Sequence, residues 1–489
     1  MKKISIDPIT RLEGHGRIDI FLNEEGDVAN AYLLIPELRG FEKFAEGRPV
    51  EEMPRITPRI CGVCPEAHHI ASAKACDAVY HVEVPPTGKK LRELLYSAFY
   101  IADHTVHFYI LAAPDFVLGP DAPPAERNIL GLIHKVGLEI GGKVIRCRGM
   151  AMDIVGMLGG KTIHPVGAIP GGVSKAINEE ERAKFEAMGH ELVEFGQFGL
   201  QLFHDVVLEN KAYVDMILSD AYTTPMYYMG LVDGNNKVNF YDGKVRVVDP
   251  EGKEFVKYAP EEYLDVVAEH VEPWTYLKFP YLKKVGWKGF VTGKDSGVYQ
   301  ATPLSRLNAA DGMATPLAQE AYEQFYETIG GKPVHGTLAT HWARLIELLY
   351  AAERLVELAT DPEITNPHVR NIPTATPDEG VAIVEAPRGT LTHHFITDEK
   401  GIVKKANLIV GTTNNYAPIS ISIKKAAQAF IKKGQVISEG ILNRVEMAFR
   451  SYDPCFGCAT HTLPGQMPLE VRIHDAERNI VDVLRQNME

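Results

Sequence analysis

Two pairs of cysteines at opposite ends of the chain constrain this sequence more than any other feature. Cys61 and Cys64 lie near the start, and Cys455 and Cys458 lie near the end of 489 residues. Thiolates are soft ligands that select zinc, copper, nickel or iron. Structural zinc sites usually place their two halves about 15–20 residues apart, whereas nearly the whole chain separates these pairs. Four thiolates from both ends favour a buried catalytic metal, with a zinc-stabilised interaction module as the alternative.

The composition excludes several classes of protein. Six cysteines are too few for the disulfide framework of a secreted domain. A net charge of −13 argues against nucleic-acid binding, because neutralising phosphates requires clustered Lys and Arg. The sequence has no apolar run of about 18 residues, and its first residues lack the apolar stretch of a signal peptide. We therefore expect a cytoplasmic protein without direct membrane insertion.

The hydrophobic pattern predicts an α+β protein with a large, mainly helical body (a central helix bundle) and small peripheral antiparallel sheets. Alternating residues in 18–22 and 31–35, and again in 381–385 and 406–410, predict hairpins. The turn-rich stretch 222–304 predicts a β-rich excursion. The predicted helices cover 65–81, 89–113, 125–158, 178–219 and 336–359. Because no linker or repeat interrupts this pattern, we expect a single domain over 1–489.

The residues around the cysteine pairs resemble a known family. The first pair lies within residues 59–68 (RICGVCPEAH) and the second within residues 453–461 (DPCFGCATH). Position for position, these resemble the two motifs of the large subunit of nickel–iron hydrogenases. The similarity extends through residues 11–15 (RLEGH), 39–42 (RGFE) and 385–389 (EAPRG). The resemblance implies the nickel–iron hydrogenase large-subunit fold and reversible heterolytic cleavage of dihydrogen.

Three further stretches indicate the type of hydrogenase within this family. Residues 39–43, the pair His393-His394 and residues 463–467 (LPGQM) are most similar to the cytoplasmic methyl-viologen-reducing type, which pairs with heterodisulfide reductase. The large subunit of the deazaflavin-reducing type is similar and is the alternative. A third class, the metal-stapled structural subunit of respiratory quinone oxidoreductases, lacks the metal-binding cysteines, so the cysteines retained here favour the enzyme.

The resemblance implies a nickel ion held by all four thiolates. Cys64 and Cys458 would also bridge to an iron that carries carbon monoxide and cyanide, while Cys61 and Cys455 would bind nickel alone. Dihydrogen is a very weak acid, so its cleavage requires a metal that takes the hydride and a nearby base that takes the proton. The Cys455 thiolate would be that base, with Glu13 as the first proton relay toward solvent.

The family motif also implies charged side chains next to the metals. Pro387 and Arg388 would contact the cofactor, with Arg388 projecting over the metals beside Asp115 and Asp453. A buried guanidinium stays protonated and is normally paired, so two acidic neighbours are expected. For Asp115 a helix N-cap is the alternative role.

A second, hard-cation site is implied by Glu42, His461 and the backbone carbonyl of Leu408. Oxygen ligands suit magnesium or another hard divalent cation, and one imidazole is tolerable. Family members are made with a tail that a maturation endopeptidase removes after this histidine. Here the tail would be residues 462–489.

The two remaining cysteines, Cys76 and Cys147, predict a partner. An iron–sulfur cluster generally takes four thiolates, so these two alone cannot hold one. We therefore expect electrons to leave through a separate iron–sulfur small subunit, and then through an electron-transfer subunit toward heterodisulfide reductase or ferredoxin.

Overall fold

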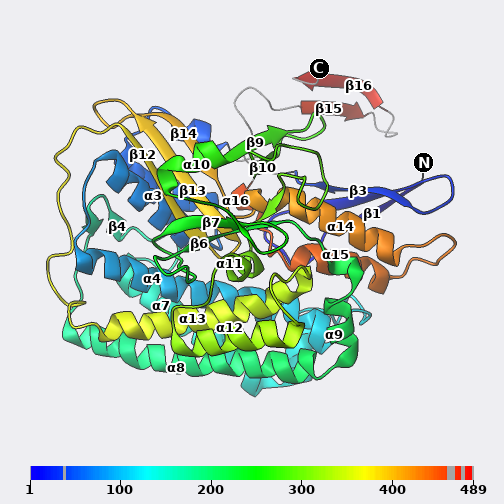
Figure 1. Cartoon of the computed structure of the whole chain (residues 1–489), viewed down its shortest axis with the longest axis horizontal. Helices are drawn as coiled ribbons and strands as arrows, with labels where there is room; N and C mark the ends of the chain where they lie inside the picture. The colour runs from blue at the N-terminus through cyan, green and yellow to red at the C-terminus, as the bar shows by residue number, and fades with distance from the viewer. Residues whose placement is uncertain (1, 37–39, 460–468, 475–479, 487–489) are drawn as a thin grey trace.

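Long helices form one side of the molecule and small sheets lie on the other (Figure 1). The computed structural model describes residues 2–36, 40–459, 469–474 and 480–486. Helix α13 (Thr340–Thr360) packs against α4 (Pro86–Thr105), α8 (Glu179–Phe203) and α12 (Pro316–Ile329), and α7 (Leu138–Gly159) packs against α4. The first half of α13 is buried on all sides, including its polar residues His341, Arg344 and Glu347. The predicted α+β class is confirmed.

Two of the predicted long helices are wrong as continuous elements. The stretch 125–158 divides into α6 (Ile129–Val136) and α7, because Gly137 has a φ of 88° that favours glycine and ends the first helix. The stretch 178–219 divides into α8, a π-helical segment and α9 (Lys211–Ile217). By contrast, the predicted helix 89–113 is helical throughout, because α4 continues without a break through the π-helical segment Val106–Ala112 into α5 (Ala113–Val117). Helix α3 (Pro65–Val79) also forms as predicted.

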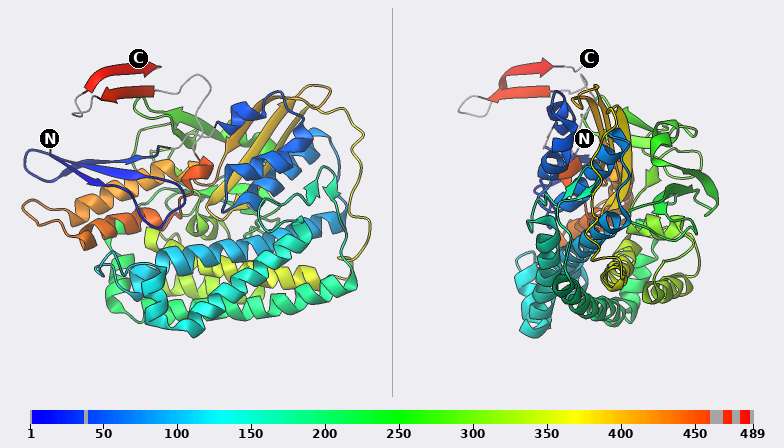
Figure 2. Two further views of the ribbon diagram at one scale, coloured as in Figure 1. Left: turned by 180° about the vertical axis from the view of Figure 1, so that it is seen from behind. Right: turned by 90° about the vertical axis from the view of Figure 1, so that its left-hand side faces the viewer.

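A three-stranded antiparallel sheet lies between helices and a second sheet. It contains β12 (Glu379–Ala386), β13 (Gly389–Thr397) and β14 (Val403–Ile409), as the hairpin pattern predicted. Helix α3 packs on one face, and strand β6 (Tyr227–Val232) on the other (Figure 2, right). Because both faces are covered, every residue of β13 except Ile396 is buried. This sheet places the two-residue turn Pro387–Arg388 inside the molecule.

The two ends of the chain meet in a separate cluster. Strands β1 (Lys2–Ile6), β2 (Arg17–Leu22) and β3 (Val28–Leu34) form an antiparallel sheet, and β3 packs against α14 (Tyr416–Phe430). Helix α15 (Glu439–Arg450) packs against α14. Apolar residues of both ends share this core. The N-terminal segment is thereby fixed beside the C-terminal cysteine motif.

The stretch 222–304 contains most of the remaining strands. Besides β6 these are β7 (Lys244–Val248), β8 (Glu254–Tyr258), β9 (Val267–Val271), β10 (Lys278–Leu282) and β11 (Tyr299–Gln300). One sheet has the order β11-β6-β7-β8, in which β11 and β6 are parallel and the other pairs antiparallel. Strands β9 and β10 form an antiparallel pair.

Short elements complete the fold. They are α1 (Phe41–Ala45), α2 (Met53–Ile56), β4 (Ala168–Ile169), β5 (Gly172–Val173), α10 (Tyr263–Val266), α11 (Pro303–Ala309), α16 (Phe456–Ala459), β15 (Leu469–His474) and β16 (Ile480–Gln486). Strands β15 and β16 form a hairpin at the periphery (Figures 1 and 2). Among the helices of the described ranges, none combines the length and apolar character that crossing a membrane requires.

Candidate metal centre

The first cysteine pair lies at the start of α3. Cys61 is extended and follows the 3-10 turn Thr57–Ile60, and Cys64 immediately precedes Pro65, the first residue of α3. The Cys61 sulfur accepts hydrogen bonds from the backbone N–H groups of Val63, at 3.1 Å, and Cys64, at 3.2 Å. Both cysteines are buried. Backbone donors directed at a buried sulfur favour its thiolate form, which is the form that binds metals.

Cys455 joins this pair from the other end of the chain. Its sulfur lies 3.3 Å from that of Cys61, and the sulfur atoms of Cys61, Cys64 and Cys455 all lie within 4.8 Å of one another. Cys458 falls in α16, and the position of its thiol lies outside the described part of the structure. Three buried sulfur donors this close together fit a soft metal ion.

Glu13 lies directly beside Cys455. The thiol of Cys455 donates to Oε2 of Glu13 at 2.9 Å, and the N–H of Gly457 donates to the same oxygen at 2.9 Å. The backbone carbonyl of Glu13 accepts from the N–H of Phe456 at 3.1 Å, which completes a short parallel bridge. The carboxylate therefore accepts two hydrogen bonds while the backbone bridge holds Glu13 in place, and a proton on Cys455 is one hydrogen bond away from the carboxylate.

Arg388 is buried between two carboxylates. Its Nη1 donates to Oδ2 of Asp103 at 3.0 Å, and its Nη2 lies 3.0 Å from Oδ2 of Asp453. Burial alone would lower the pKa of Arg388, but Asp103, Asp453 and the nearby Cys455 raise it well above its ordinary value. The guanidinium is therefore a permanent positive charge next to the cysteines.

Comparison of the sequence and the fold with known proteins identifies the family of this chain. The family model for nickel-dependent hydrogenase matches residues 39–129 and 124–461. An Archaeoglobus profundus protein, named as an iron-sulfur subunit of F420-non-reducing hydrogenase, is 51% identical over 485 residues, which cover 99% of this chain and 100% of the relative. The chain belongs to the nickel-dependent hydrogenase family. The sequence-based identification as a hydrogenase large subunit is confirmed.

Two further relatives extend the family match. The beta subunit of the NAD-reducing hydrogenase HoxS of Cupriavidus necator is 38% identical over 496 residues and aligns with 98% of this chain and 99% of its own length. A solved structure of an NAD+-reducing NiFe hydrogenase in the H2-reduced state has a TM-score of 0.88 at 36% identity, covering 94% of this chain and 100% of that one. The chain therefore has the hydrogenase large-subunit fold.

The predicted position of one aspartate in this hydrogenase is wrong. Asp115 does not lie beside Arg388; it binds Arg450 at 2.6 Å and also pairs with Arg11. Burial would raise the pKa of Asp115, but these two guanidinium groups lower it below its ordinary value. The intervening π-helical segment Val106–Ala112 separates Asp115 from Asp103, which is the residue that pairs with Arg388.

Sequence reasoning missed two acidic residues near the centre. Asp103 lies in the last turn of α4, where a charged residue within an otherwise apolar run was the available signal. Glu66 lies in the first turn of α3, and burial raises its pKa to about 8, with smaller contributions from Asp103 and Cys61. Burial therefore favours the neutral, protonated form of the Glu66 carboxyl group.

The residues of the predicted hard-cation site lie together around a buried lysine. Oε1 of Glu42 accepts from the backbone N–H of Leu408 at 2.7 Å and from Nζ of Lys278 at 2.8 Å. The Lys278 ammonium also lies 2.9 Å from Oε1 of Glu269. Burial would lower the pKa of Lys278, but Glu269 and Glu42 raise it above its ordinary value. His461, the third predicted ligand, lies outside the described residues.

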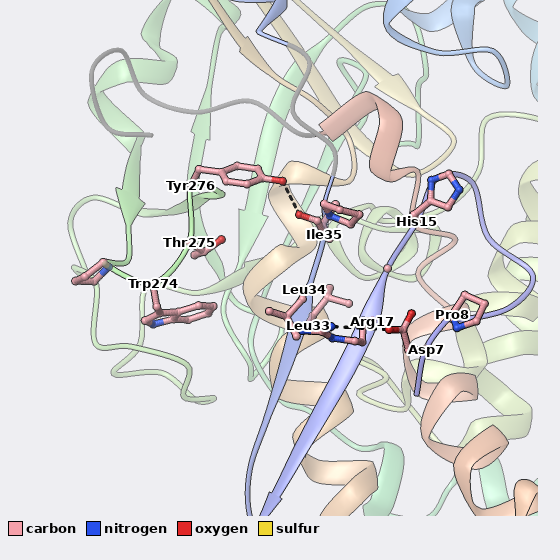
Figure 3. Close-up of a pocket in the computed structure, with 13 residues that line it drawn as sticks. Asp7, Pro8, His15, Arg17, Leu33, Leu34, Ile35, Trp274, Thr275 and Tyr276 are labelled. Atoms are coloured by element: carbon pink, nitrogen blue, oxygen red, sulfur yellow. Dashed lines mark hydrogen bonds and ion pairs between the residues drawn. The ribbon is translucent and has the colours of Figure 1, made fainter. Parts of the chain in front are cut away.

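A separate cavity of about 540 Å³ flanks the segment that carries Glu13 (Figure 3). It lies between β2 and β3 on one side and the loop of Trp274 and Tyr276 on the other. The Tyr276 hydroxyl closes one edge by donating to the carbonyl of Ile35. His15, two residues beyond Glu13, is exposed and lines the cavity. Solvent therefore reaches the chain close to the carboxylate side of the centre.

His69 provides a pH-dependent test of the packing around α3. Its Nδ1 contacts the carbonyl of Pro54 at 2.6 Å and its Nε2 accepts from the N–H of Ala168 at 2.8 Å, so the ring is neutral. Burial lowers its pKa from 6.5 to about 4. A lowered folded-state pKa gives stability that is present above pH 6.5 and lost as the pH falls toward 4.

We expect the free energy of unfolding to fall between pH 6.5 and pH 4 by roughly 3 kcal/mol on account of His69. Urea denaturation of the metal-free chain, compared with His69→Asn, measures this contribution. Asparagine keeps the donor to Pro54 but does not titrate, so its curve should lack that part of the slope. Parallel curves for the two proteins would contradict the expectation.

Proposed function

We propose that this chain is the catalytic subunit of a nickel–iron hydrogenase that reversibly cleaves dihydrogen into protons and electrons. The observation that carries the proposal is the convergence of the Cys61, Cys64 and Cys455 sulfurs within 4.8 Å. Cys458, from the same motif as Cys455, is the fourth proposed ligand. When bound, the nickel–iron centre, with carbon monoxide and cyanide on the iron, supplies the redox-active Lewis acid that accepts the electron pair of dihydrogen.

The protein supplies the proton path. The Cys455 thiolate accepts the proton, and Glu13 receives it across the 2.9 Å contact between Sγ and Oε2. The hydrogen bond from Gly457 to the same carboxylate oxygen fixes its direction. From Glu13 the proton moves toward solvent in oxidation of dihydrogen, and the reverse path serves its production.

Arg388 and its neighbours shape the pocket around the reaction. The guanidinium, paired with Asp103 and Asp453, holds a fixed positive charge beside the thiolates. Pro387 restricts the turn that carries it, since its ring fixes φ. These residues orient the substrate side of the centre and occupy space that water would otherwise fill. No role in this step is assigned to Asp115, whose partners lie elsewhere.

Electrons leave through a separate iron–sulfur subunit. Cys76, buried in α3, donates to the carbonyl of Val50, and Cys147 is buried in α7, so neither belongs to the thiolate cluster. Gly62, between Cys61 and Cys64, is exposed, and a Cβ atom added there would have no neighbour within 4 Å. An iron–sulfur subunit that docked on this open surface would lie close to Cys61. The names of relatives as F420-non-reducing favour the heterodisulfide-reductase type over the deazaflavin-reducing type.

A magnesium ion fits the site around Glu42. In an antiparallel strand the N–H and C=O of one residue point to the same side, so the carbonyl of Leu408 faces the edge where its N–H meets Glu42. Glu42 and Glu269 together exceed the single charge of Lys278, which leaves a net negative site for a divalent cation. His461 would complete the ligand set.

Maturation and location extend the same proposal. A maturation endopeptidase removes residues 462–489 after His461, and this part of the chain contains the peripheral hairpin β15–β16. The protein works in the cytoplasm, as the sequence predicts. The mass of the active subunit tests the first statement, because an uncleaved active subunit would exclude processing.

Metal analysis of the purified complex tests the proposed function. We expect one nickel and one iron in the catalytic subunit, with infrared bands of carbon monoxide and cyanide, and hydrogen-dependent reduction of a viologen dye. Cys64→Ser should remove the bands, because a hydroxyl is a poor ligand for soft metals. Zinc alone, without such bands or activity, would replace the proposal with a zinc-stapled structural subunit.

A further inference from the structure

Arg388 stands at the tip of a turn that needs support. Strand β12 ends at Ala386 and β13 begins at Gly389, so only Pro387 and Arg388 form the connection. The carbonyl of Arg388 accepts from the side chain of Asn415 at 2.8 Å. The two residues before Arg388 are Ala386 and Pro387. Hydrogen bonds to their backbone carbonyls fix the path of the turn and, with it, the place of the Arg388 guanidinium.

Arg306 holds both of those carbonyls. Its Nη1 donates to the carbonyl of Ala386 at 2.9 Å, and its Nη2 donates to that of Pro387 at 3.1 Å. The remaining N–H groups donate to Glu347, at 2.6 and 2.7 Å, and to Glu385, at 2.9 Å. Arg306 lies in α11 and is fully buried. All five donors of the guanidinium are thus used, which fixes it rigidly.

The carboxylate partners connect Arg306 to the other side of Arg388. Glu347, in α13, also contacts Nε2 of His104 at 3.0 Å. His104 follows Asp103, the residue that pairs with Arg388. Glu385 accepts in addition from the backbone of Leu231 and the hydroxyl of Thr390. One network therefore reaches Arg388 both through its backbone and through its ion-pair partner.

The buried charges of this network require a reason other than stability. A buried ion network is often no more stable than apolar residues of the same volume, whereas removing one member leaves an uncompensated charge. We propose that Arg306 is a positioning residue for hydrogen cleavage, which sets the place of Arg388 beside the thiolates by clamping the carbonyls of Ala386 and Pro387. This inference rests on the proposed function.

The test compares wild-type and Arg306→Lys holoenzyme complexes. Lysine keeps the charge but is a point donor that cannot span two carboxylates and two carbonyls. We expect nickel and iron contents to be retained, the infrared bands to shift, and kcat for hydrogen oxidation to fall roughly 10²-fold with a smaller change in KM. Unshifted bands with wild-type kcat would overturn the inference, and so would loss of nickel in proportion to activity.

Arg92→Lys is the matched control. Arg92 is equally buried and also combines an aspartate, Asp77, with two backbone carbonyls, those of Ile169 and Gly172, but none belongs to the turn of Arg388. Its variant should lose similar thermal stability and keep wild-type bands and kcat. An equal loss of kcat in this control would reduce Arg306 to a structural role and overturn the inference.

Glu347→Gln covers the case in which Arg306→Lys does not accumulate. It removes one charge from the clamp and retains an amide oxygen as acceptor, and the same band shift and kcat decide the outcome. The proposed function fails separately, since wild-type complex without nickel and infrared bands would refute it whatever the variants do.

Discussion

Replacing Cys455 with alanine should abolish hydrogen oxidation, lowering the rate by at least roughly 10⁴-fold. The substitution removes one of three sulfurs that lie within 4.8 Å, and with it the group that donates to Glu13. Nickel content should fall together with activity, because the remaining thiolates leave an open position. Nickel analysis and hydrogen-dependent dye reduction on the purified complex measure both quantities.

Cys76→Ala is the control for the loss of a buried thiol. Cys76 is as buried as Cys455, but its sulfur donates to the carbonyl of Val50 rather than joining the cluster. This variant should keep its nickel and its activity and lose about 1 kcal/mol of stability. A Cys455→Ala complex with wild-type nickel and half its activity would refute the assignment of this cysteine.

Substitution of Glu13 by glutamine should stop proton transfer while leaving the centre assembled. Glutamine is nearly isosteric and keeps an oxygen that accepts from Gly457, so the bridge between the two chain ends survives. It cannot take a proton from Cys455, and we expect activity to fall about 10²–10⁴-fold. Metal content and the infrared bands of the complex should stay close to those of the wild type.

Two further variants bracket that result. Glu13→Asp keeps a carboxylate but shortens the reach to the sulfur, so its activity should lie between those of the wild type and Glu13→Gln. Glu93→Gln removes a half-buried carboxylate that pairs with Arg354, and should leave activity unchanged. Full activity in Glu13→Gln would exclude this residue as the relay.

The sequence predicted which residues cluster, because few residue types bind soft metals. Cys61 and Cys64 are spaced so that both sulfurs can face one ion, and the motif resemblance at both ends of the chain predicted that Cys455 would join them, as it does. Glu13 followed from the motif around it, and the contact with Cys455 is present. The helical body and the small sheets followed from periodicity.

The partner of Arg388 could not be derived in the same way. Asp103 and Asp115 are both buried in one helical stretch with a π-helical segment between them, and Asp103 pairs with Arg388 whereas Asp115 pairs with Arg450. A π-helical turn changes the phase of the helix without a clear sequence signal. The break at Gly137 was similarly hidden, since an isolated glycine is tolerated inside a helix.

The roles of Arg306 and Lys278 could not be predicted from the sequence for a different reason. Their importance comes from residues distant in sequence: Glu347 and Glu385 for Arg306, and Glu42 for Lys278. No local sequence pattern identifies a buried Arg or Lys whose partners lie on other helices and strands. Such groups emerge only when the burial and the hydrogen bonds of each polar side chain are followed in three dimensions.

The bridge between Glu13 and Cys455 has a consequence for biosynthesis. The two residues are 442 positions apart, so Cys455 is synthesised long after Glu13. Cys61 and Cys64 leave the ribosome early, when Cys455 has not yet been synthesised. The closed thiolate cluster therefore cannot form on a nascent chain, and a polypeptide truncated before its last segment carries an active site that never closes.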